Sequence, residues 1–114
     1  MQEYKQQLLR LLVEHGWELV ERVDGEEWWL EEAWKVRSTR QRWGYEIYIV
    51  FLIDPMDAGN GKRRVWSIAA CESIPAQRPL RGSIATMDMQ KGRFDEKVGL
   101  LVETIDAHRN AVGF

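Results

Sequence analysis

The segment of residues 45–53, YEIYIVFLI, limits the folds open to this chain more than any other stretch. If it forms a β-strand, its side chains alternate between the two faces of a sheet. Both faces are then apolar, with Ile47, Ile49, Phe51 and Ile53 on one and Tyr48, Val50 and Leu52 on the other. Such a strand belongs in the middle of a sheet that is covered on both sides.

Helical patterns stand at the two ends of the chain. An apolar stripe at helical spacing runs through Tyr4, Leu8, Leu11, Leu12 and His15, and Gly16 follows as a C-terminal cap. A second stripe at the same spacing contains Val98, Leu101, Val102, Ile105 and Val112, with Asp95 as the N-cap. The sequence therefore predicts one helix at each end of the chain.

Three further segments alternate with the period of a β-strand, namely residues 17–23, 28–36 and 64–72. Asp24 and Gly25 lie between the first two segments, and this pair is the strongest short-range signal for a two-residue hairpin loop. A hairpin with that loop would place Leu19 directly opposite Leu30.

The order of these elements predicts a two-layer α+β fold, α-β-β-β-β-α, in a single domain of residues 1–114. Because the links between strands are short, we expect a four-stranded antiparallel β-meander flanked by the N- and C-terminal helices. Both helices should pack on one face of the sheet. Residues 73–93 contain several prolines and glycines and are expected to be irregular.

This layout leaves the second face of the sheet to be explained. We expect the helices to cover the face formed by Trp17, Leu19, Trp28, Leu30, Trp34 and Val36. The opposite face would carry Trp29, Tyr48, Val50 and Leu52, joined by Trp66 if the fourth strand has the matching register. Its cover would be residues 73–93 folded back, a second copy of the chain, or a foreign partner.

The pattern of reactive side chains does not predict catalysis, a cofactor or a metal ion. His15 and His108 belong to different terminal helices, and the lone Cys71 lies among small residues of a strand. The neighbouring carboxylates of Glu31 and Glu32 would point to opposite faces of a strand. The loop after the central strand lacks the spacing of a calcium or phosphate loop. We therefore predict that the chain is not an enzyme.

Basic residues gather in two loops, although the formal net charge of the chain is −2. Loop 37–43 carries Arg37, Arg40 and Arg42, and loop 62–64 carries Lys62, Arg63 and Arg64. Basic side chains beside aromatic rings are typical of surfaces that bind nucleic acids. The two loops lie at opposite ends of a meander, however, so they need not form one patch. Nucleic-acid binding through these six residues is the alternative function.

The composition favours a cytoplasmic protein. No apolar run approaches the roughly 18 residues that a membrane span needs, and a single cysteine suits a reducing compartment. The aromatic second face indicates a non-enzymatic interaction module that forms a homodimer through Trp29, Tyr48, Val50, Leu52 and Trp66. A foreign protein partner on that face is the other occupant that the sequence leaves open.

Overall fold

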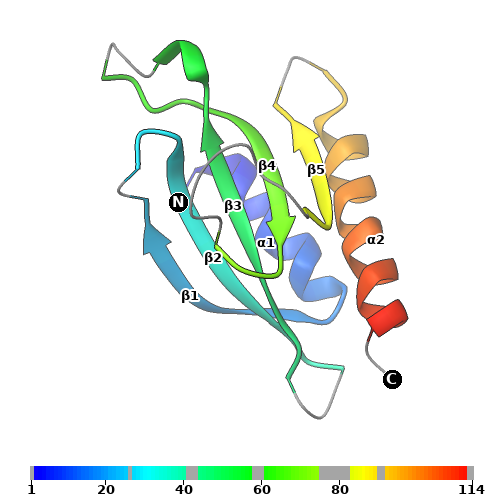
Figure 1. Ribbon diagram of the computed structural model, residues 1–114. Helices are drawn as coiled ribbons and strands as arrows, with labels where there is room; N and C mark the ends of the chain where they lie inside the picture. The colour runs from blue at the N-terminus through cyan, green and yellow to red at the C-terminus, as the bar shows by residue number, and fades with distance from the viewer. Residues whose placement is uncertain are drawn as a thin grey trace.

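The computed structural model describes residues 2–25, 27–40, 44–57, 61–74, 83–89 and 92–112. Along the chain the elements are α1 (Glu3–Glu14), β1 (Trp17–Asp24), β2 (Leu30–Ser38), β3 (Glu46–Ile53), the 3-10 turn η1 (Pro55–Asp57), β4 (Val65–Cys71), β5 (Ala85–Asp88) and α2 (Phe94–Val112) (Figure 1). Among the predicted positions, Arg42 and most of the segment between β4 and β5 lie outside the described residues.

The five strands form one antiparallel sheet in the order β1-β2-β3-β4-β5. Each strand pairs with its neighbours in the chain, so the predicted meander and the α+β class are confirmed. As expected, the doubly apolar strand β3 occupies the centre of the sheet. The sheet has five strands where the sequence predicts four, because residues 85–88 form a short edge strand beside β4. Four residues are too few to display a clear strand period.

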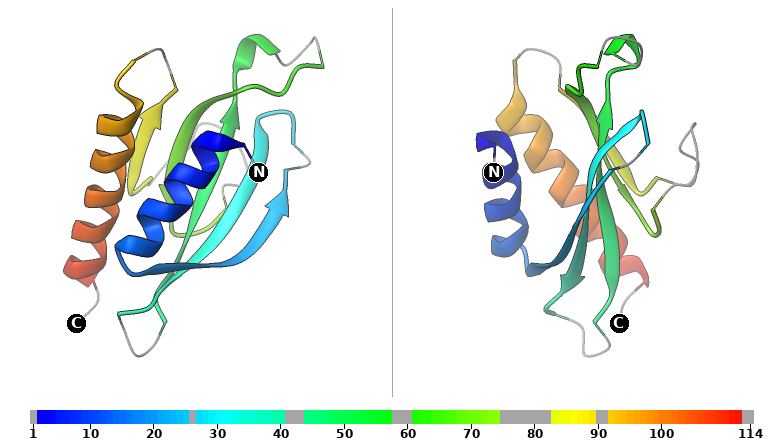
Figure 2. Two further views of the ribbon diagram at one scale, coloured as in Figure 1. Left: turned by 180° about the vertical axis from the view of Figure 1, so that it is seen from behind. Right: turned by 90° about the vertical axis from the view of Figure 1, so that its left-hand side faces the viewer.

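Both helices lie on one face of the sheet, as Figure 2 shows. The main core fills the space between the two helices and this face. This core contains Leu8 and Leu12 of α1 and Val98, Leu101, Val102 and Ile105 of α2, packed on Trp17, Trp34, Val36, Ile47, Ile49, Phe51, Ile68, Ala70 and Met87 of the sheet. The alternation of Ile49 and Phe51 with Val50 along β3 is what the two-sided strand requires.

A second apolar cluster lies on the opposite face of the sheet. It consists of Trp29, Leu30, Ala33, Val50, Leu52, Ala69 and Cys71, with Val23 and Tyr48 packed against it. The predicted face assignment is therefore wrong for two residues. Leu30 belongs to the second face, and Trp28 is 49% exposed in the loop before β2.

The predicted register of the first hairpin is also wrong. Leu19 pairs with Val36 rather than with Leu30, and residues 25–29 connect the two strands. The structure requires glycine at position 25, but the reason is not a tight two-residue turn. A Cβ atom at this position would lie 1.8 Å from the carbonyl oxygen of Leu30, so only glycine permits the close approach of the two backbones.

Gly16 is the position at which glycine provides a left-handed conformation, with φ +84° immediately after α1. We expect Gly16→Ala to lower the free energy of unfolding by about 1 kcal/mol, because an alanine is strained at positive φ. Gly99→Ala is the matched control, since its Cβ meets no atom within 4 Å in α2. That control should raise the free energy by up to about 1 kcal/mol. Urea unfolding of both variants tests the contrast; equal shifts would contradict it.

Candidate functional site

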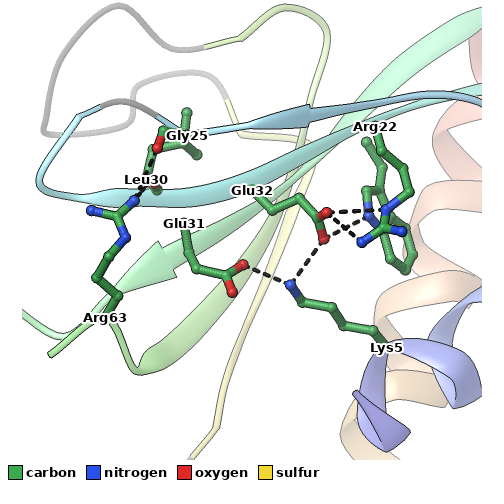
Figure 3. Close-up of polar contacts among 8 residues, drawn as sticks. Lys5, Arg22, Gly25, Leu30, Glu31, Glu32 and Arg63 are labelled. Atoms are coloured by element: carbon green, nitrogen blue, oxygen red, sulfur yellow. Dashed lines mark hydrogen bonds and ion pairs between the residues drawn. The ribbon is translucent and has the colours of Figure 1, made fainter. Parts of the chain in front are cut away.

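Charged side chains from α1 and the first hairpin converge in the space between these two elements (Figure 3). The ammonium group of Lys5 donates to Glu31 Oε1 at 2.6 Å and to Glu32 Oε1 at 2.9 Å. Lys5 is 4% exposed and Glu32 is 5% exposed, so this ion pair is almost removed from water. The Lys5 ammonium also lies 4.5 Å from the centre of the Phe51 ring.

This convergence corrects the prediction that Glu31 and Glu32 point apart. The register between β2 and β3 shifts between Leu30 and Glu32, so Glu31 is an additional residue in β2. Leu30 and Ala33, three positions apart, consequently share the second face. Such a β-bulge interrupts the strict alternation of side chains. Both carboxylates are thereby able to reach one lysine.

Glu32 accepts hydrogen bonds from three other side chains. Besides Lys5, the donors are Arg22 Nε at 3.0 Å, Arg22 Nη2 at 2.7 Å and Trp34 Nε1 at 2.9 Å. Burial raises the pKa of Glu32, but the hydrogen bonds from Lys5, Arg22 and Trp34, together with the charge of Lys5, hold it below its ordinary value. The carboxylate is therefore ionised at neutral pH, and each of its two oxygens accepts two hydrogen bonds.

A polar hollow of about 440 Å³ opens beside this cluster, lined by Gln2, Lys5, Arg22, Asp24, Glu31 and Glu32. Its buried charges already neutralise one another. Within the described ranges, no group of three or more His, Cys, Asp or Glu side chains is arranged to hold a metal ion. The arrangement is that of a structural ion-pair cluster, which anchors α1 to the first hairpin.

The lowered pKa of Glu32 makes part of the stability depend on pH. Its contribution is complete above the ordinary pKa of a glutamic acid and is lost as the pH falls through the lowered value. We expect the wild type to lose more unfolding free energy than Glu32→Gln on titration from about pH 7 to about pH 3. Chemical denaturation at each pH measures both slopes. Parallel slopes would refute the assignment.

The second face brings together four of the five predicted interface residues. Trp29, Val50 and Leu52 are 4%, 0% and 4% exposed, and Tyr48 packs at the edge of the same cluster. Trp66 is not a member of it and is 39% exposed near the start of β4. Trp29, Val50 and Leu52 therefore offer little surface to another molecule.

The predicted basic residues are divided between the two ends of the sheet (Figure 1). At one end Arg37 pairs with Glu46 at 2.8 Å, and Arg40 is exposed. At the other end Lys62 is exposed, while Arg64 forms an ion pair with Asp57 at 2.8 Å.

Arg63, at the same end as Lys62 and Arg64, forms hydrogen bonds with the backbone of the first hairpin. Its Nη2 donates to the carbonyl oxygens of Gly25 at 3.0 Å and Leu30 at 2.8 Å (Figure 3). It thus ties the loop after β3 to the first hairpin. The predicted basic residues that the structure describes are therefore split into two separate groups.

Sequence reasoning missed a polar cluster between the ends of the helices. Asp106 of α2 pairs with His15 and accepts a hydrogen bond from Trp17 Nε1 at 3.0 Å. Arg109, which is fully buried, forms an ion pair with Asp106 at 3.3 Å and stacks 4.7 Å from the centre of the Trp17 ring. Burial lowers the pKa of Arg109. The residues involved are far apart in the chain, so no local spacing indicates them.

Sequence reasoning also missed a groove between β5 and α2. The groove has a volume of about 260 Å³ and is lined by Ala85, Thr86, Met87, Asp88, Lys97, Leu100, Leu101 and Thr104. All four residues of β5 contribute to it. Because consecutive strand residues point to opposite faces, the groove must follow the edge of the strand. Leu100, on the helix wall, is 65% exposed.

Comparison of the chain with protein-family models, curated proteins and solved structures found no match. Among the described residues, no helix has the length and apolar character required to cross a membrane.

Proposed function

We propose that this protein is a non-enzymatic interaction module that forms a homodimer through the groove between β5 and α2. The observation that carries the proposal is Leu100, which is 65% exposed beside the outer edge of a sheet. An apolar side chain next to an open strand edge is the kind of surface that a partner covers. Two-fold homodimers are the commonest soluble assemblies, which favours a second copy as the partner.

The groove is a better pairing surface than the aromatic face that the sequence suggests. Trp29, Val50 and Leu52 have almost no accessible surface to contribute, whereas Leu100 and Thr86 are both exposed. The polar clusters do not compete for this role, because their charged groups are engaged with one another. The ion pairs of Arg37 and Arg64 likewise reduce the support for nucleic-acid binding.

Leu100→Glu is expected to weaken the dimer by about tenfold or more, because two buried carboxylates would replace apolar contacts. Val13→Glu is the control, since Val13 is 57% exposed on α1 and lies away from the groove. Light scattering over a range of concentrations measures both. We expect twice the monomer mass for the wild type and for Val13→Glu. A wild type that stays monomeric at the highest concentration would rule out the proposed function.

A further inference from the structure

The hydrogen-bond pattern of β5 determines which of its backbone groups face outward. Met89 N donates to Trp66 O at 2.7 Å, so these two residues form a hydrogen-bonded pair at the end of the β4–β5 ladder. Hydrogen-bonded and non-hydrogen-bonded pairs alternate along an antiparallel ladder. The next hydrogen-bonded pair is Ile68 with Met87, and Thr86 falls between such pairs. The backbone N–H and C=O of Thr86 consequently point away from β4.

The two edges of the sheet differ in how well they are protected against pairing. The β1 edge contains a bulge between Leu19 and Glu21 and carries Glu18, Glu21, Arg22 and Asp24. Bulges and charges are the usual devices that prevent strands from pairing with other chains. Residues 85–88 pair with β4 without a break, and the one irregularity lies just before them, where Ile84 N donates to Ala70 O, the partner of Ala85. The charged residue of β5, Asp88, is neutralised by Lys97 of α2 at 2.6 Å.

We propose that two copies of the chain pair through their β5 strands, antiparallel about a two-fold axis at Thr86. This inference rests on the proposed homodimer and specifies how it is built. The N–H of Thr86 in each copy would donate to the carbonyl oxygen of Thr86 in the other copy, which gives two hydrogen bonds across the axis. The two five-stranded sheets would then form one continuous sheet.

Charge and shape both suit this arrangement. The axis at Thr86 places the two copies of Asp88 on opposite sides of the axis, so these like charges do not face each other across the strands. Lys97 contacts Asp88 at one end of β5, and from there α2 runs alongside the strand as far as Thr104. Leu100 therefore lies beside the middle of β5, close to the axis. Each copy would cover the exposed leucine of the other.

The axis is tested by cross-linking of Thr86→Cys. Residues in a hydrogen-bonded antiparallel pair have Cα atoms about 5.5 Å apart, within the range that a disulfide spans. We expect mild oxidation to give a covalent dimer with Thr86→Cys. Val13→Cys, exposed on α1, is the control and should not cross-link. The native Cys71 is buried in both variants.

Thr86→Pro provides a second readout, because proline removes the outward N–H without removing a bond to β4. We expect a folded monomer by circular dichroism and light scattering. If the wild type is dimeric but Thr86→Cys fails to cross-link and Thr86→Pro still dimerises, edge pairing is overturned while the homodimer stands. If the wild type is monomeric, the proposed function itself has failed. Should Thr86→Pro not fold, the cross-linking result alone decides.

Discussion

Lys5→Met is expected to lower the free energy of unfolding by about 3 kcal/mol. The substitution removes the ammonium group that contacts both Glu31 and Glu32, and Glu32 is 5% exposed. A buried carboxylate that loses its partner keeps the cost of desolvation without the compensating attraction. Because Arg22 still donates to Glu32, we expect a loss of unfolding free energy at the lower end of the range that is usual for broken buried ion pairs.

Lys35→Met is the matched control for Lys5→Met. Lys35 pairs with Glu46 at 3.7 Å, and both side chains are partly exposed. Such a pair contributes less than about 1 kcal/mol. The double variant Lys5→Met with Glu32→Gln should recover part of the loss, because it removes the buried carboxylate that has lost the charge of Lys5. Equal losses for the two single lysine variants in urea denaturation would contradict the anchor role of Lys5.

Trp34→Ala is expected to cost about 4 kcal/mol, the second large effect. Trp34 is fully buried, packs edge-on against Phe51 with ring centres 4.8 Å apart, and donates to Glu32. Its loss would open a cavity in the main core and remove one donor from the buried carboxylate.

Trp28→Ala is the control for Trp34→Ala, because the same side chain is deleted from a position that is 49% exposed. We expect a loss of at most about 1 kcal/mol there. Thermal and urea unfolding of the two variants give the comparison. A similar loss at both positions would show that burial of Trp34 does not determine the effect.

The sequence predicts the elements of this fold better than it predicts their registers. The doubly apolar pattern of β3 specifies an interior strand, because a strand at the edge of the sheet does not need apolar side chains along both of its faces. The stripes in α1 and α2 specify which side of each helix is covered. These predictions succeed because each depends on burial alone, which a local pattern records.

The first hairpin shows why register is harder to predict. The pair Asp24-Gly25 is typical of a two-residue turn with positive φ, but Gly25 serves a close approach to Leu30 O instead. The bulge at Glu31 then shifts every later side chain of β2 by one position relative to Leu30. Neither feature has a distinctive composition, since both arise from contacts between strands.

The candidate sites were less predictable than the fold. Glu31 and Glu32 come together only because of the bulge, and the partner Lys5 is a polar residue in an otherwise ordinary helix. The β5–α2 groove depends on a strand of only four residues. Tertiary contacts create both features, and no spacing in the sequence encodes them.

The meander also favours one order of assembly during folding. Strands that neighbour each other in sequence close short loops, and short loops cost little chain entropy. The contacts of Asp106 with His15 and Trp17 span about 90 residues and join the two ends of the chain. We therefore expect α2 to dock against the start of β1 late in folding, after the strands have paired.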